Sequence, residues 1–337
     1  MSTSLVTEPQ DSALAGGSNP APLAFLYEHP QWFAPAFAEL ERRGVPFQKL
    51  FAPDTFYAID DQSEPSFKVL FNRMSPSSDR RGHGSGIFHT LAWLGHLELQ
   101  GVRVLNGVKA FQHEISKALQ HSLIQSLGLR YIPSRVIHRA EQAVAAAEGL
   151  RYPVVVKPNV GGSGAGIVRF DTPEELAAVV REGKLELGFD HIALVQEFVP
   201  ARGGYITRVE TVGGKYLYAI QVHLTGETFD LCPADICQTA RGESLNTACV
   251  LEASKAGLRV EAYTPPPEVI EAIERIIQGA GIDVGGIEYI VDDRDGQVYY
   301  YDVNALSNFV ADPVRVIGFN PFERLADYLQ AEVARAR

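Results

Sequence analysis

The segment around Lys157 constrains the fold more than any other part of the sequence. A β-branched run from Val154 to Lys157 is followed at once by Pro158 and a glycine-rich stretch, residues 159–166, and then by another strand-like run. A strand, a glycine loop and a second strand predict a hairpin. The pattern is not a Walker A loop, because no Gly-Lys-Ser/Thr closes it, and not a dinucleotide fingerprint, because no long helix follows.

This hairpin has the chemistry of a phosphate site. Glycine allows successive backbone N–H groups to converge on an anion, and a lysine beside the loop supplies a mobile cation. The alternative is a hairpin with a flexible glycine tip and a surface lysine. The candidate phosphate-binding residues are Lys157, Gly161, Gly162, Ser163, Gly164 and Gly166.

A second signal is the end of an apolar strand predicted over residues 192–198. The run finishes in Gln196, Glu197 and Phe198 and breaks at Pro200. A strand edge of this kind offers backbone groups to an adenine ring, as a hinge between lobes does. The alternative is an ordinary strand end.

A third signal lies in a late hairpin predicted over residues 286–303. Asp302 and Asn304 are two residues apart, so both side chains point to one face, and Glu288 on the partner strand faces them. Two carboxylates and an amide oxygen suit Mg²⁺. The alternative is a solvated polar sheet face. Such a solvated face is expected for Asp292, Asp293 and Asp295.

Residues 22–115 are predicted to form an open α/β domain. Strand-like runs alternate with helical ones, which implies parallel pairing with helical crossovers. The expected strands are residues 23–27, 45–51, 67–72 and 102–105, and the expected helices are residues 31–43 and 86–99.

Two further lobes are predicted downstream, at residues 116–200 and 201–337, after a helix over residues 111–127 that Gly128 ends. The first lobe carries helices at 140–148 and after Asp171, and strands at 152–157, 166–170 and 192–198. The second reads as antiparallel, with hairpins at 205–224 and 286–303 and helices at 265–279 and from 321 onward. Residues 1–21 are predicted to be a disordered tail.

Composition limits the class of protein. The chain has 337 residues and a formal net charge of −11, which disfavours a nucleic-acid partner. No apolar run approaches the roughly 18 residues of a membrane helix, and no secretory signal is seen, so a cytoplasmic protein is expected. Three cysteines favour reduced thiols over a disulfide framework or half a metal site: Cys232, Cys237 and Cys249.

The three signals occur in the order lysine and glycine loop, hinge, acidic hairpin. In this order the sequence resembles the ATP-grasp superfamily, especially RimK-type glutamate ligases and glutathione synthetases, over residues 100–325. The resemblance implies an ATP-grasp fold of α/β and α+β character with an N-terminal open parallel-sheet (pre-ATP-grasp) domain. Residues 116–200 would be the small lid lobe, and residues 201–337 the large lobe. A homodimer or homotetramer is also implied.

The resemblance also implies roles for individual residues. Lys117 and Lys157 would contact the nucleotide, the glycine loop would cover its phosphates, and Glu197 and Phe198, with Gln196 beside them, would hold the adenine. One or two Mg²⁺ ions, or Mn²⁺, would bind Glu288, Asp302 and Asn304, where the family usually has Glu in place of Asp302. Arg208 would contact the transferred phosphate or the substrate.

Three other stretches concern the substrates. Ile206 stands where the family often has an acid that binds ribose, and residues 229–241 do not match an Arg-Ser-Asn element of RimK-type ligases, which leaves Arg241 as a candidate substitute. Arg73, after a predicted strand, is a candidate carboxylate clamp. Further candidates for the same cleft, each with a surface role as the alternative, are His29, Trp32, Arg80, Arg81 and His83.

The expected activity is ligation of a carboxylic acid to an amine, or less readily a thiol, through an acyl phosphate formed from Mg-ATP. Two alternatives remain open at this stage. One is a small-molecule kinase of the same superfamily, which needs a basic acceptor pocket, and the other is a non-catalytic nucleotide-binding module.

Overall fold

The computed structural model describes residues 21–29, 31–61, 63–162, 164–224 and 259–336. The predicted tail, apart from Ala21, and the three cysteines therefore lie outside the described residues. Three sheets follow one another along the chain, and the predicted boundaries at 115 and 200 fall between them. None of the described helices is long and apolar enough to cross a membrane.

The first sheet, called the N-terminal sheet here, is parallel as predicted. Its four strands have the order β2-β1-β3-β4. The two central strands are buried, β1 except at Tyr27 and β3 along its whole length, as the central strands of a parallel sheet require. The elements of this domain are β1 (Leu23–Tyr27), α1 (Ala34–Arg42), β2 (Phe47–Phe51), β3 (Val69–Arg73), α2 (Ser85–Leu99) and β4 (Arg103–Leu105).

The helix predicted over residues 111–127 is two helices, α3 (Val108–Glu114) and α4 (Lys117–Ser126). The interruption has a local cause, because Ser116 has extended backbone and its side chain accepts a hydrogen bond from Leu119 N. A serine in this role begins a new helix. The break places Lys117 in the first turn of α4.

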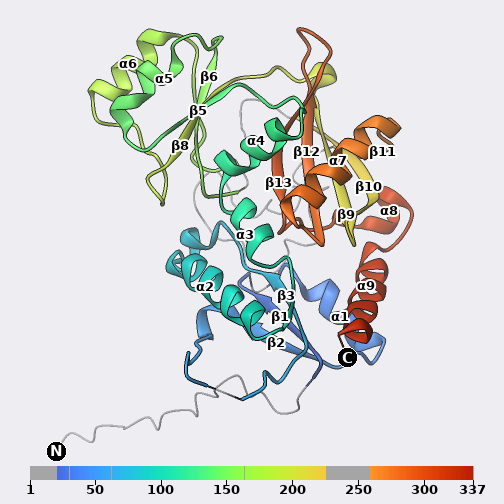
Figure 1. Ribbon diagram of the computed structural model, residues 1–337. Helices are drawn as coiled ribbons and strands as arrows, with labels where there is room; N and C mark the ends of the chain where they lie inside the picture. The colour runs from blue at the N-terminus through green and yellow to red at the C-terminus, as the bar shows by residue number, and fades with distance from the viewer. Residues whose placement is uncertain (1–20, 30, 62, 163, 225–258, 337) are drawn as a thin grey trace, which may run out of the picture.

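The second sheet, the lid sheet, is antiparallel with strand order β5-β8-β6-β7. The helix predicted after Asp171 is α6, whose cap is Thr172, followed by Pro173 and two acids in the first turn. Figure 1 shows this lobe in green, with α5 and α6 beside its strands. Its elements are β5 (Ser134–Ile137), α5 (Ala143–Ala147), β6 (Val154–Pro158), β7 (Val168–Phe170), α6 (Pro173–Arg181) and β8 (Ala193–Glu197).

The third sheet, the large sheet, has the antiparallel order β11-β10-β9-β12-β13. Helix α7 packs an apolar face of Val269, Ile273, Ile276 and Ile277 on this sheet. Strand β11 and helix α8 were not predicted. The elements are β9 (Tyr205–Val212), β10 (Lys215–His223), β11 (Val260–Tyr263), α7 (Pro267–Ala280), β12 (Val284–Val291), β13 (Val298–Asn304), α8 (Pro313–Ile317) and α9 (Pro321–Arg335).

The last helix, α9, returns to the N-terminal domain. Leu325 and Leu329 of α9 share one buried cluster with Phe25 and Phe37, and Arg43 forms an ion pair with Asp327. Figure 1 shows α9 running down beside α1. The end of the chain therefore completes the core of the first domain.

Asn106 joins the N-terminal domain to the large sheet. Its buried side chain donates to Val284 O and Ala305 O, both at 2.7 Å, and accepts from the N–H groups of Asp283 and Val284. Its backbone is left-handed (φ 52°), a conformation that Asn tolerates better than most residues. One side chain thus satisfies four backbone groups across the junction.

We predict that Asn106→Ala will lower the free energy of unfolding by about 2–4 kcal/mol, because buried backbone groups lose their partners. Asn320→Ala is the matched control, since Asn320 only caps α9, and its expected loss is about 1 kcal/mol. Urea unfolding followed by circular dichroism measures both. Equal losses in the two variants would contradict this view of the junction.

Candidate nucleotide and metal site

The three units enclose a cavity of about 660 Å³. The lid contributes Lys157, Gln196 and the glycine loop, and the large sheet contributes Arg208 and the acidic hairpin. The N-terminal domain closes one end with Trp32 and the loop after β3. A cavity of this size lies in the range typical of small-molecule sites.

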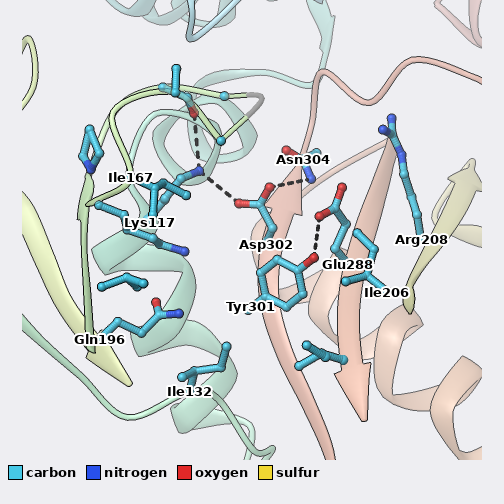
Figure 2. A pocket seen from close by; sticks show the side chains of 18 of the residues that line it. Lys117, Ile132, Ile167, Gln196, Ile206, Arg208, Glu288, Tyr301, Asp302 and Asn304 are labelled. Atoms are coloured by element: carbon cyan, nitrogen blue, oxygen red, sulfur yellow. Dashed lines mark hydrogen bonds and ion pairs between the residues drawn. The ribbon is translucent and has the colours of Figure 1, made fainter. Parts of the chain in front are cut away.

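The three predicted metal-binding side chains lie together on the wall of this cavity, as Figure 2 shows. Glu288 on β12 is directly opposite Asp302 on β13, and Asn304 follows two residues later. Asn304 Nδ2 donates to Asp302 Oδ2 at 3.1 Å, which leaves the amide oxygen of Asn304 for another partner.

A β-bulge next to this pair was not predicted. The register of β12 and β13 shifts after Glu288 and Asp302, so Tyr301 has no opposite residue. A bulge turns two successive side chains toward one face, and both Tyr301 and Asp302 line the cavity. Tyr301 donates to Glu288 Oε2 at 2.8 Å, which orients this carboxylate.

Two lysines face the acids. Lys117 Nζ donates to Asp302 Oδ1 at 3.0 Å and to Gly161 O at 3.3 Å. Lys157, at the end of β6, lines the same cavity with its ammonium 5.9 Å from the ring centroid of Tyr301. Lys117 therefore links the lid loop to the acidic hairpin.

Burial and mutual charge shift the pKa values of these groups. Burial, with help from the charge of Lys117, lowers the pKa of Lys157 to about 8. Burial and the charge of Asp302 raise the pKa of Glu288 to about 7. Burial opposes ionisation of Asp302, but Lys117 and Lys157 outweigh it and lower its pKa. The site thus places buried groups of both signs next to one another, which suits a phosphate and a cation bound together.

The donor set fits a metal that keeps other ligands. Within the described residues, no group of three or more His, Cys, Asp or Glu side chains is placed to hold a metal ion. Glu288, Asp302 and the amide oxygen of Asn304 form a smaller, all-oxygen set. Mg²⁺ is commonly bound by one or two carboxylates together with water and substrate phosphates, so this set fits Mg²⁺ bridged to a nucleotide.

The glycine loop leads into the cavity with little steric obstruction. A Cβ at Gly161 or Gly162 would meet nothing within 4 Å. Gly166 has a left-handed backbone (φ 75°), and a Cβ there would lie 2.9 Å from Pro158 Cγ, so only glycine fits this turn. Strand β7 begins at Val168 rather than at 166, and Ser163 lies outside the described residues.

The hinge residues line the cavity, but two of their backbone N–H groups already have partners. Glu197 N donates to Pro133 O at 3.0 Å, and Phe198 N donates to Pro153 O at 2.9 Å. The Glu197 carboxylate accepts from Arg151 N at 3.1 Å. Contacts of these residues with an adenine must therefore use atoms other than these two N–H groups.

Apolar side chains form the walls around the hinge, and Gln196 extends among them (Figure 2). Ile206 is one of these side chains. It stands at the position where related sequences often have an acid, and in this chain it contributes apolar surface instead. The apolar residues of this part are Ile132, Val155, Val199, Ile206 and Ile290.

Arg208 lies in the cavity wall next to the acids. It is directly opposite Glu288 in the sheet. Its guanidinium donates to Glu210 Oε1 at 2.6 Å, to Ser307 Oγ at 2.6 Å and to Asn308 O at 2.8 Å. Glu210 is fully buried and was not predicted; it also accepts from Ser307 Oγ. This network fixes the position of Arg208.

Arg73 does not have the predicted role of a carboxylate clamp in this cavity. Its guanidinium is buried outside the cavity lining and donates to Ala305 O at 2.7 Å and to Ser307 O. It also stacks on the rings of Phe33 and Phe71. Arg73 therefore anchors the segment after β13, which the sequence did not reveal because the partners are backbone carbonyls.

The other upstream candidates differ in where they lie. Trp32 lines the cavity, Arg81 and His83 both bond the buried carboxylate of Glu28, and His29, which stacks on Trp32, and Arg80 are not part of the cavity lining. Arg241 and residues 229–241 lie outside the described residues.

A residue that sequence analysis missed is Glu114, which lines the cavity and accepts a hydrogen bond from Leu306 N at 2.9 Å. Burial raises the pKa of Glu114 to about 7.

The chain is similar to known proteins over part or most of its length. Residues 116–199 match the family described as carbamoyl-phosphate synthase L chain, ATP binding domain. A D-alanine–D-alanine ligase of Actinobacillus pleuropneumoniae is 28% identical over 80% of this chain and 82% of its own length. The corresponding ligase of Geobacter sulfurreducens is 31% identical, but the match covers 40% of this chain and only 42% of that enzyme.

Solved structures share the fold at low sequence identity. The ATP-grasp ligase PsnB, solved with a precursor variant, Mg and ADP, has a TM-score of 0.64 at 16% identity and covers 93% of this chain and 98% of its own. A RimK domain ATP-grasp protein from Sphaerobacter thermophilus has a TM-score of 0.60 at 16% identity, covering 91% and 99%. The chain therefore has the ATP-grasp fold that its sequence resemblance implied.

Proposed function

We propose that the protein is an ATP-dependent, ADP-forming ligase that joins a small carboxylic acid to an amine through an acyl phosphate. One observation carries the proposal: Lys117 and Lys157 face Glu288, Asp302 and Asn304 across a single cavity. Cations on one side and a metal-binding set on the other are what a polyphosphate bound with a divalent ion requires. The acid, the amine and the nucleotide are the partners in this proposal.

The nucleotide would lie with its base toward the hinge and its phosphates toward the lysines. The apolar walls around Gln196 provide the flat, apolar surroundings that a purine ring needs. Lys117 and Lys157 lie where the phosphates would follow, and the loop from Gly161 offers backbone N–H groups to them.

Glu288, Asp302 and the amide oxygen of Asn304 would hold one or two divalent ions. When bound, Mg²⁺, or Mn²⁺ with similar ligand preferences, neutralises phosphate charge and orients the γ-phosphoryl group. Tyr301 keeps Glu288 aimed at this position through its hydrogen bond.

In the first step, a carboxylate oxygen of the substrate attacks the γ-phosphorus of ATP. An O–P bond forms to give the acyl phosphate, the bond between the γ-phosphorus and the bridging oxygen breaks, and ADP leaves. The guanidinium of Arg208, held by Glu210 and Ser307, would neutralise charge that develops on the transferred group.

In the second step, the amine nitrogen attacks the acyl carbon. A C–N bond forms, the C–O bond to phosphate breaks, and the nitrogen loses a proton as inorganic phosphate leaves. Water must be excluded while the acyl phosphate exists. The glycine loop, which contacts Lys117 through Gly161 O, is placed to cover this part of the cavity.

Two findings support ligation over a kinase activity. The relative that matches 80% of this chain is by its name a ligase that joins D-alanine to D-alanine. The arginines that would make a basic acceptor pocket have internal partners, since Arg73 donates to backbone carbonyls and Arg81 to Glu28. A panel of acids and amines with Mg-ATP, followed by phosphate assay and mass spectrometry, separates the activities, because a kinase leaves phosphate on its product.

We predict that Asp302→Asn will lower the rate of phosphate release at least about 100-fold, because the metal and Lys117 lose a charged partner. Asp293→Asn is the matched control, since Asp293 is an exposed acid in the turn of the same hairpin, and it should retain activity. Equal activity of the two variants would rule out the proposed metal site.

We also predict that the affinity for Mg-ADP will fall as pH rises above about 8. Lys157 has a pKa of about 8 in the free protein, and phosphate stabilises its protonated form, so binding at higher pH must take up a proton. Calorimetric titrations from pH 7.5 to 9.5 should show that the association constant for Mg-ADP falls by a factor approaching tenfold per pH unit.

The Lys157→Gln variant should bind Mg-ADP more weakly at pH 7.5 and lose this pH dependence. Lys184→Gln removes an exposed lysine of the lid and should retain both the affinity and the dependence. A pH dependence that persists without Lys157 would assign it to another group.

A further inference from the structure

A second pocket, called the α1 pocket here, adjoins the reaction cavity. It has a volume of about 490 Å³ and lies between α1, the ends of β1 and β3, and the segment from Ser307 to Leu325. Most of its lining is apolar, and much of it is aromatic. The aromatic and large aliphatic residues in the lining are Phe25, Trp32, Phe33, Phe71, Val284, Phe309, Val310, Val314, Phe322 and Leu325.

The α1 pocket and the reaction cavity share a wall. Trp32, Ser307 and Asn308 line both spaces. Trp32 is fixed in this wall because its ring stacks on His29 at 4.1 Å between centroids. Ser307 and Asn308 also bond Arg208. The inner end of the pocket is therefore next to the residues proposed to act on the transferred phosphoryl group.

The outer end of the α1 pocket reaches the protein surface. Its lining there includes Arg42, Asp312 and Val314, all more than half exposed. The charged side chains at this rim are paired within their own segments, Arg42 with Glu39 and Asp312 with Arg315. Between the rim and the shared wall the pocket offers apolar surface.

An open apolar pocket of this size suits a small molecule, because small-molecule sites are concave and mostly apolar. The guanidinium of Arg73, which is part of the lining, donates to the carbonyl oxygens of Ala305 and Ser307. A ring or a branched aliphatic group matches this lining better than a polar one.

We propose that one of the two substrates is an amino acid, or an amino-acid-like molecule, with an aromatic or large aliphatic side chain that binds in the α1 pocket. Its reacting group extends beyond Trp32 and Asn308, which line both spaces, into the reaction cavity. This inference rests on the proposed ligase function for the presence of two substrates, and it adds the class of side chain that one of them carries.

Binding can be measured without turnover, through the fluorescence of Trp32. The sequence has two tryptophans, and Trp93 is buried in the core of the N-terminal domain, so Trp93→Phe leaves Trp32 as the single reporter. This protein, saturated with Mg-ADP, is titrated with D- and L-phenylalanine, leucine, alanine and glycine. We expect phenylalanine or leucine of one configuration to bind at least about tenfold more tightly than alanine.

Ala36→Leu fills the pocket, because Ala36 is a buried residue of α1 in its lining. Ala34→Leu is the matched control on the same helix, at an exposed position outside the lining. Ala36→Leu should reduce the preference for the large side chain to less than about threefold and leave the dissociation constants of alanine and Mg-ADP unchanged. Ala34→Leu should keep the preference, and thermal melts verify that both variants fold.

The outcomes separate the two proposals. The α1 pocket is not a substrate site if the protein shows no preference for large apolar side chains, or if the preference survives Ala36→Leu. A pocket filled by a segment of the chain, or by a second copy of it, would give no preference. If glycine and phenylalanine support phosphate release equally, the proposed ligase activity stands and the proposed class of substrate is wrong. If amino acids bind in the α1 pocket but no acid and amine support phosphate release, the binding site stands and the proposed ligase activity is wrong.

Discussion

The charges that face one another across the reaction cavity determine the rest of this structure. Glu288 and Asp302 lie opposite each other on neighbouring strands, and the ammonium of Lys117 bonds Asp302 from α4. Burial makes each of these charges costly without a partner, which is reflected in the raised pKa of Glu288 and the lowered pKa of Lys157. A nucleotide phosphate bound with a divalent ion would balance both sets at once.

The scaffold holds these charges with contacts that lie away from the cavity. Asn106 ties the N-terminal domain to the start of β12 and the end of β13, and Arg73 anchors the backbone at Ala305 and Ser307. In the same short segment, Ser307 accepts a hydrogen bond from Arg208, and Asn308 is part of the wall that the two pockets share. The proposed substrate selection and phosphate chemistry would thus both depend on one well-anchored segment.

The sequence predicted what depends on periodicity and on local motifs. The parallel N-terminal sheet follows from alternating strands and helices, and the grouping of Asp302 with Asn304 follows from the two-residue period of a strand. The break before Lys117 was missed because helical periodicity continues through Ser116, although serine is a common helix cap. The fully buried Asp292, expected in solvent, bonds Arg294 inside the hairpin turn. Long-range contacts such as Glu210 with Ser307 and Arg73 with Ala305 leave no local signal.

The central claim is that the acidic hairpin and the two lysines bind a single metal–nucleotide complex. A crystal structure of the protein with ADP and Mg²⁺ tests it most directly. We expect Mg²⁺ at about 2.0–2.1 Å from carboxylate oxygens of the Glu288–Asp302 pair, with the diphosphate between the ion and Lys157. A nucleotide bound elsewhere, or an ion that touches neither carboxylate, would contradict the account.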